Sequence, residues 1–119
     1  MRAKRGEVVL VDYPYSDRTG SKVRPCLVVQ TDRNNQRLQD IIVVMITSRT
    51  HLAGSEPTQL LIDVSTPDGQ QSGLLFNSAV QRENVLTIDT SFIRRRLGTL
   101  TTSTMQQVGD CLKSALDIA

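Results

Sequence analysis

The chain has 119 residues, 39% of them apolar and 22% charged, the proportions of a soluble globular protein with one domain. Its formal net charge is +2, which is too small to indicate a nucleic-acid-binding protein by itself. No apolar run approaches the ~20 residues that span a bilayer, and the N-terminal residues contain no apolar segment long enough for a signal peptide. We therefore expect no membrane segment. Cys26 and Cys111 lie far apart in the sequence, so we expect neither a disulfide nor a metal site. We therefore predict one cytoplasmic domain over residues 1–119.

Short apolar runs rich in β-branched residues predict strands. They cover residues 8–11, 26–30, 41–46 and 59–63, with a broken fifth strand over 73–80 and further strands or a 3₁₀ turn over 84–88 and 95–100. The run at 41–46 is apolar without alternation, which is typical of a strand buried on both faces. The polar residues 31–37 predict a loop or one helical turn, and Pro67-Asp68-Gly69 predicts a turn.

Only the C-terminal segment has a helical pattern. Met105, Val108 and Leu112 follow one another at three- and four-residue steps and form one apolar stripe. Thr101 is one candidate N-cap, and Ser103 is another, one turn later. Short strands separated by turn residues and followed by one helix predict a mainly β fold, either a small barrel or a sandwich.

The stretch from Asp12 to Gln30 carries the first candidate site. Pro14 ends the first strand because it cannot donate a ladder hydrogen bond, and the polar residues around Gly20 predict a loop. Pro25 forces Arg24 into an extended backbone at the mouth of the next strand. A planar guanidinium held in this way suits a phosphate, although Arg24 on this evidence could equally be an ordinary surface arginine.

The usual catalytic motifs are missing from the sequence. There is no histidine pair, no Cys-x-x-Cys, no glycine-rich phosphate loop and no Gly-x-Ser-x-Gly, and His51 lies in a polar segment where a solvated side chain is expected. The carboxylates are too scattered for a two-metal site. What remains are polar residues at strand ends: Ser16, Ser21, Arg24, Thr47, Ser48, Ser78 and Asn84.

These residues occur in an order that is specific as a set. Residues 5–17, Arg-Gly-Glu-Val-Val-Leu-Val-Asp-Tyr-Pro-Tyr-Ser-Asp, and 20–29, Gly-Ser-Lys-Val-Arg-Pro-Cys-Leu-Val-Val, are followed by Thr47-Ser48, by Gly73-Leu74 before Ser78-Ala79-Val80, and by residues 84–89 and 97–100. In this order and spacing, the sequence resembles the MazF/PemK family of toxin endoribonucleases over almost its whole length.

The resemblance implies an SH3-like barrel with a C-terminal α-helix, as in MazF, PemK and the gyrase poison CcdB. It implies a homodimer that cleaves single-stranded RNA without a metal or other cofactor and is blocked by a small antitoxin protein. The family's catalytic Arg and Thr correspond to Arg24 and Thr47. The expected RNA-binding residues are Tyr13, Ser16, Ser21, Ser48, Ser78 and Asn84, the last of which stands where the family often has Gln.

Cleavage of this kind uses the 2′-OH of the RNA as nucleophile and leaves a 2′,3′-cyclic phosphate, so Arg24 and Thr47 need only stabilise the charge on the phosphate oxygens. A guanidinium is a poor base at neutral pH, so the group that takes the proton is left open. Arg94, Arg95 and Arg96 could follow the RNA backbone or face solvent. Two alternatives are a gyrase poison, although the terminus lacks the Trp-Gly-Ile of the CcdB type, and a non-catalytic nucleic-acid-binding barrel.

Overall fold

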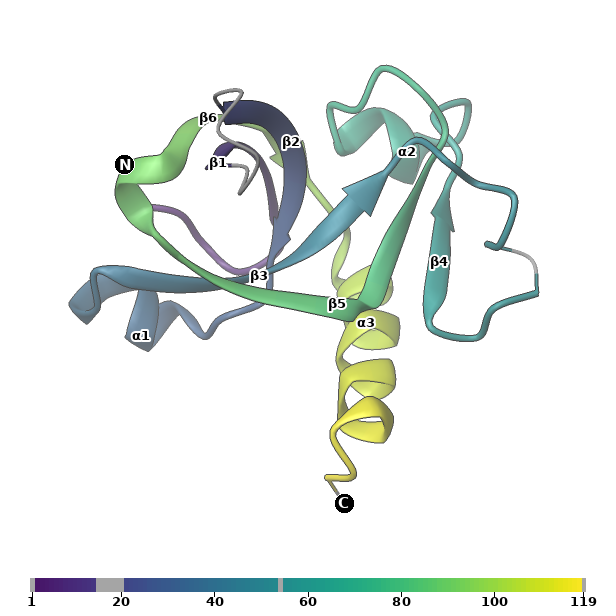
Figure 1. Cartoon of the computed structure of the whole chain (residues 1–119). Coiled ribbons are helices and arrows are strands. Elements are labelled where there is room, and N and C mark those ends of the chain that lie inside the picture. The colour runs from purple at the N-terminus through teal and green to yellow at the C-terminus, as the bar shows by residue number, and fades with distance from the viewer. Residues whose placement is uncertain (1, 15–20, 54, 119) are drawn as a thin grey trace.

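The computed structural model describes residues 2–14, 21–53 and 55–118, with the backbone alone for Tyr13, Pro14 and Ser21. Within these ranges, six antiparallel strands form one sheet in the order β4-β5-β3-β2-β1-β6. The strands are β1 (Glu7–Pro14), β2 (Ser21–Val28), β3 (Asp40–Thr47), β4 (Gln59–Ile62), β5 (Ser78–Asp89) and β6 (Ile93–Thr99). The helices are α1 (Asp32–Arg37), α2 (Pro67–Gln71), the 3₁₀ turn η1 (Thr90–Phe92) and α3 (Thr102–Ala115). The sheet curls strongly, and α3 lies across its β5 side (Figure 1), which confirms the predicted mainly β fold with a C-terminal helix.

The second strand begins earlier than predicted. We expected Arg24 and Pro25 to stand at the mouth of a strand starting at Cys26, but β2 starts at Ser21 and places both residues inside it. Residues 21–25 pair with β1, where Pro25 lies opposite Leu10. Pairing with β3 begins only at Cys26, so the first half of β2 has one neighbour, and a residue without an N–H is tolerated there.

The fifth strand is one long element and not the predicted broken pair of segments. Residues 73–77 lie outside it, while β5 runs unbroken into the stretch that we assigned to a separate strand. It carries a bulge: Val44 and Met45 are adjacent on β3 but pair with Val85 and Gln81, so residues 82–84 have no partner on β3. Such bulges bend a strand and redirect its side chains.

The predicted turn at Pro67-Asp68-Gly69 is instead the start of the short helix α2. Thr66 caps it, since its Oγ accepts a hydrogen bond from the N–H of Gly69 at 3.0 Å, and Pro67 occupies the first turn, where its missing N–H costs nothing. At the other end of the chain, Thr101 is the N-cap of α3, the earlier of the two predicted positions.

Two apolar clusters fill the two faces of the curled sheet. Alternate residues of β1 contribute to opposite faces, with Val9 in one cluster and Val8 in the other. Adjacent residues of β3 divide in the same way, since Val43 belongs to the first cluster and Val44 to the second. This confirms the prediction that the third strand is buried on both faces. Val108 of α3 belongs to the second cluster and is fully buried.

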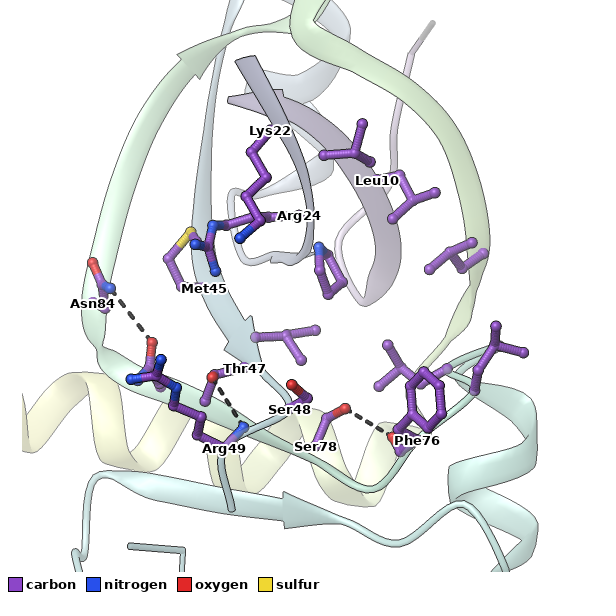
Figure 2. Close-up of a pocket in the computed structure, with 18 of the residues that line it drawn as sticks. Leu10, Lys22, Arg24, Met45, Thr47, Ser48, Arg49, Phe76, Ser78 and Asn84 are labelled. Atoms are coloured by element: carbon purple, nitrogen blue, oxygen red, sulfur yellow. Dashed lines mark hydrogen bonds between the residues drawn. The ribbon is translucent and has the colours of Figure 1, made fainter. Parts of the chain in front are cut away.

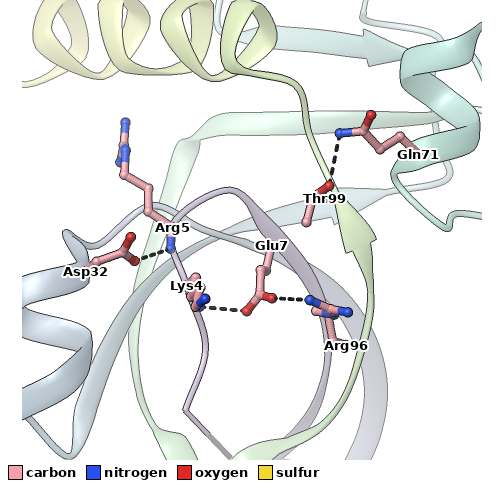
Figure 3. A network of polar contacts seen from close by, with 7 residues as sticks. All are labelled: Lys4, Arg5, Glu7, Asp32, Gln71, Arg96 and Thr99. Carbon is pink, nitrogen blue, oxygen red and sulfur yellow. Dashed lines mark hydrogen bonds and ion pairs between the residues drawn. The ribbon is translucent and has the colours of Figure 1, made fainter.

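Polar contacts fix the N-terminal segment against β6. The Oε atoms of Glu7, a residue that is 7% exposed, accept hydrogen bonds from the backbone N–H of Lys4 at 2.6 Å and from Nη1 of Arg96 at 2.8 Å (Figure 3). Further along β6, the side-chain oxygen of Thr99 accepts a hydrogen bond from Nε2 of Gln71 at 3.0 Å. These contacts join the N-terminus, β6 and α2.

A buried arginine joins β5 to the C-terminal helix. Arg82, in the bulge, is 8% exposed and donates hydrogen bonds to the carbonyl oxygens of Pro57 (2.5 Å), Thr58 (2.9 Å) and Gln107 (3.1 Å). Three backbone acceptors thus satisfy a charged group that would otherwise be costly to bury. No helix within the described residues is both long enough and apolar enough to cross a membrane.

Candidate active site

A cleft of about 900 Å³ opens between β2, the end of β3, the bulge of β5 and the segment that precedes β5 (Figure 2). Five of the residues singled out from the sequence line it: Arg24, Thr47, Ser48, Ser78 and Asn84. They come from three strands and from the residue after β3, so the fold brings together side chains that are distant in the sequence.

Arg24 lies on β2 and is half-buried in the wall of the cleft. Figure 2 shows its guanidinium beside Met45 and on the same side of the cleft as Lys22. Burial raises the pKa of the nearby thiol of Cys26 to about 12, and the positive charge of Arg24 opposes this shift in part. Cys26 is therefore a neutral thiol at physiological pH, and it does not line the cleft.

Thr47 is the last residue of β3 and is half-buried. Its Oγ1 accepts a hydrogen bond from the backbone N–H of Arg49 at 3.1 Å. A hydroxyl has one proton and two lone pairs, so this contact holds the oxygen in place while leaving the O–H as a donor. Thr47 can therefore donate a hydrogen bond to an anionic oxygen in the cleft.

The other polar side chains differ in what they can offer. Ser48 is exposed, whereas Ser78 is 4% exposed and its Oγ donates to the carbonyl oxygen of Phe76 at 2.8 Å. Because its one proton is used in this bond, Ser78 is better placed to fix the backbone than to donate to a ligand. Asn84 is exposed on the bulge of β5, and its amide makes a long contact of 3.5 Å with Gln81.

The remaining predicted RNA-binding residues lie at the edge of what the structure describes. Ser16 lies outside the described residues, and Tyr13 and Ser21 are described through their backbone alone, as partners in the β1–β2 pairing. Their predicted roles stay predictions.

Two further cations of the cleft, Lys22 and Arg49, were not among the predicted site residues, and Arg95 belongs to the arginine cluster whose role the sequence left open. Lys22 could have been found, because it stands two residues before Arg24, and alternate residues of a strand face the same side. The arginine cluster of β6 is split: Arg95 lines the cleft, whereas Arg96 pairs with Glu7 and Arg94 is exposed.

The cleft is positively charged. Within the described residues that line it, the ionisable side chains are Lys22, Arg24, Arg49 and Arg95, with no carboxylate and no histidine. His51 is exposed in a turn beyond β3 and does not line the cleft. No group of three or more His, Cys, Asp and Glu within the described ranges could hold a metal ion. Cations and hydroxyls without carboxylates are suited to binding phosphates.

The chain matches known proteins over almost its whole length. Residues 4–116 match the family described as PemK-like, MazF-like toxin of type II toxin-antitoxin system. The chain belongs to this toxin family. Its curated relatives include endoribonuclease MazF6 of Mycobacterium tuberculosis, 31% identical over 99% of this chain and 100% of the relative. Endoribonuclease MazF9 of the same species is 28% identical over 97% of each chain.

Solved structures of MazF toxins share the fold. The crystal structure of MazE-MazF (Form-III) from Deinococcus radiodurans matches with a TM-score of 0.80 at 18% identity, covering 100% of both chains. An endoribonuclease in complex with its cognate antitoxin from a mycobacterial species matches with a TM-score of 0.73 at 23% identity, covering 99% of this chain and 96% of the other. The MazF-like fold expected from the sequence is thus confirmed.

Proposed function

We propose that this MazF-like toxin is a sequence-specific endoribonuclease that cleaves single-stranded RNA, chiefly messenger RNA, and that a cognate antitoxin neutralises it. The family membership and the curated endoribonucleases among its relatives support this proposal. The observation that carries it is geometric: Arg24 and Thr47, which come from different strands, line one cationic cleft.

The reaction requires no nucleophile from the protein. The 2′-oxygen of the RNA forms a bond to phosphorus, the bond between phosphorus and the 5′-oxygen breaks, and the 2′-OH proton is lost while the 5′-oxygen gains one. The products are a 2′,3′-cyclic phosphate and a 5′-hydroxyl, without any change of oxidation state. Negative charge builds on the non-bridging oxygens, where Arg24 and the O–H of Thr47 act as donors. Each such preorganised donor contributes about 3–4 kcal/mol, or 10²–10³ in rate.

We assign Arg24 to charge stabilisation and not to proton abstraction. A guanidinium stays protonated at neutral pH, so it is suited to donating hydrogen bonds to the phosphate and not to accepting a proton. Water or hydroxide then accepts the 2′-OH proton. Lys22, Arg49 and Arg95 would hold the phosphates on either side of the scissile link.

The same charge pattern bears on the partners. We further propose that this protein is a cytoplasmic homodimer of single-domain chains. An acidic segment of the antitoxin would cover its cleft. Structures of MazE-MazF from Deinococcus radiodurans and of a mycobacterial endoribonuclease with its cognate antitoxin support the antitoxin part. A cationic cleft is complementary to an acidic peptide for the same reason that it is complementary to RNA.

The decisive experiment incubates the purified protein with a varied pool of single-stranded RNA in the presence of EDTA and sequences the ends. We expect cleavage at a short recurring sequence, with cyclic phosphate termini. Arg24→Ala should abolish it, whereas Arg94→Ala, which removes an exposed arginine outside the cleft lining, should not. A folded protein that cuts no RNA would favour gyrase poisoning or simple binding, and loss of activity with EDTA that Mg²⁺ restores would refute the metal-independent mechanism.

A further inference from the structure

An exposed aromatic ring lines the cleft beside the proposed catalytic residues. Phe76 is 70% exposed, and it belongs to the same cleft as Arg24 and Thr47. Figure 2 shows it across the cleft from Asn84 and Arg49, with Ser48 and Ser78 lying between it and Thr47. A single exposed apolar residue is common on protein surfaces. The manner in which the backbone of Phe76 is held distinguishes it.

The segment that leads to Phe76 is anchored at its start. Gly73 has a φ of +75°, and a Cβ at this position would lie 2.1 Å from the carbonyl oxygen of Leu97, so the chain passes against β6 with no space between them. The next residue, Leu74, packs against the second core cluster together with Leu97. The turn is thus fixed by a close backbone approach and by apolar burial.

The segment is anchored at its end as well. The carbonyl oxygen of Phe76 accepts the hydrogen bond from Ser78, and the next side chain, Asn77, accepts one from the backbone N–H of Val64 at 2.9 Å through its Oδ1. Contacts on both sides therefore restrain the backbone that carries an exposed ring. Because this backbone is already restrained, a flat ligand that binds the ring does not have to order the segment that carries it.

We infer that Phe76 is a stacking platform for the RNA base next to the scissile phosphate, an inference that rests on the proposed function. Single-stranded nucleic acids are bound by grooves that combine cations along the backbone with aromatic rings under the bases. Lys22, Arg24 and Arg49 supply the first element, and Phe76 supplies the second. Phe92, the other phenylalanine of the chain, does not line the cleft.

RNA fits this wall better than a second copy of the chain. The ring shares its cleft with four cations and several hydroxyls and no carboxylate within the described lining. These cations attract phosphates, and the described lining offers no carboxylate with which basic patches of a second copy could pair. The aromatic ring then contributes through its π-face, which every base can use.

The test compares Phe76→Leu and Phe76→Tyr with the wild type and with Phe92→Leu as the matched control. Single-stranded RNA hexamers with 2′-fluoro sugars, which lack the nucleophile, carry 2-aminopurine at each position in turn. For wild type and Phe76→Tyr, we expect quenching of the 2-aminopurine fluorescence at one position on binding. For Phe76→Leu, we expect that quenching to be lost and the affinity to fall by about 5- to 150-fold. In cleavage assays, KM should rise by a similar factor while kcat changes by less than about threefold.

The outcomes separate this inference from the proposed function. If the wild type cleaves RNA but Phe76→Leu matches Phe92→Leu in quenching and KM, the stacking role is refuted and the nuclease stands. If the wild type quenches 2-aminopurine through Phe76 but cuts nothing, the nuclease proposal fails and the RNA-binding role of the ring stands. A variant that changes sedimentation and leaves RNA binding intact would overturn the inference in favour of a protein contact.

Discussion

Replacing Thr47 by valine removes one hydroxyl from the cleft and keeps a side chain of nearly the same shape. If the O–H donates to a non-bridging phosphate oxygen in the transition state, its loss should lower kcat by 10²–10³, or about 3–4 kcal/mol. The KM for RNA should change by less than about threefold, because the cations that bind the phosphates remain in place. Thr47→Ser keeps the donor and should retain activity within about tenfold of the wild type.

The cost in stability is small for a reason that the structure provides. The Oγ1 of Thr47 accepts its hydrogen bond from the N–H of Arg49, an exposed residue, so water can replace the lost acceptor. We therefore expect the free energy of unfolding to fall by less than about 1 kcal/mol. A loss in kcat of about 3–4 kcal/mol beside a loss in unfolding free energy of less than about 1 kcal/mol would identify a role of Thr47 in the reaction and not in folding.

The assay measures single-turnover cleavage of a short RNA that carries the mapped site, together with urea denaturation of each variant. Thr87→Val is the matched control, because Thr87 is an exposed threonine on β5 that does not line the cleft. A Thr47→Val protein that is folded and cleaves within about threefold of the wild type would refute the reasoning. Equal losses for Thr47→Val and Thr87→Val would do the same.

Three other substitutions test separate parts of the structure. Arg24→Lys keeps the charge but loses the planar fork, and we expect a 10- to 100-fold loss in kcat; activity equal to that of wild type would show that charge alone suffices. The pKa of Cys26, raised to about 12 by burial, keeps the folded state protonated while the unfolded chain ionises near pH 9. Stability should therefore fall by about 1.4 kcal/mol per unit between pH 9 and pH 12, and Cys26→Ala should flatten that slope; parallel denaturation curves against pH would contradict this. Arg82→Met removes the side-chain hydrogen bonds to three carbonyl oxygens, of which only that of Thr58 keeps a backbone N–H donor from residue 82. It should lower the free energy of unfolding by about 2–4 kcal/mol; a urea midpoint that does not move would show that water replaces the guanidinium.

Local patterns were sufficient for the elements whose signals are local. The apolar run of β3 predicted a strand buried on both faces, and the 105-108-112 stripe predicted α3, with Thr101 as one of two candidate N-caps. The same kind of signal was ambiguous at α2, because Thr66, Pro67 and Gly69 favour a turn and a capped first helical turn equally. The backbone hydrogen bonds that continue past the first turn, such as that from the N–H of Ser72 to the carbonyl oxygen of Asp68 at 3.2 Å, distinguish the helix from a turn.

Features that depend on a distant strand could not be predicted in this way. Pro25 indicated the start of a strand, but β1 extends far enough to pair with residues before it, and the sequence does not show where β3 begins to pair. The bulge of β5 is equally non-local, since it depends on the register with β3. Residues 73–76 read as part of a strand, which concealed the exposed position of Phe76.

The candidate site likewise combines residues that the sequence points to with an arrangement that only the structure shows. Arg24 and Thr47 were ordinary strand-end residues until the family resemblance gave them roles, and elementary chemistry added only that a guanidinium and a hydroxyl suit a phosphate. Their presence on one cleft follows from the antiparallel order of β2, β3 and β5. Arg49 needed the structure, because nothing in the spacing of the sequence relates it to Arg24, and only the structure shows which arginine of the 94–96 cluster lines the cleft.

Two of the three residues of β5 that have no partner on β3 contact different parts of the molecule. Arg82 points toward the C-terminal helix and holds it, whereas Asn84 reaches the cleft. The backbone at these positions has no partner on β3, so no β3 side chain lies directly opposite position 84 to restrict which residue stands there. On the proposed function, a substitution at position 84 would change the contacts that the cleft makes with RNA, while the scaffold and the hydrogen bonds of Arg82 stay as they are.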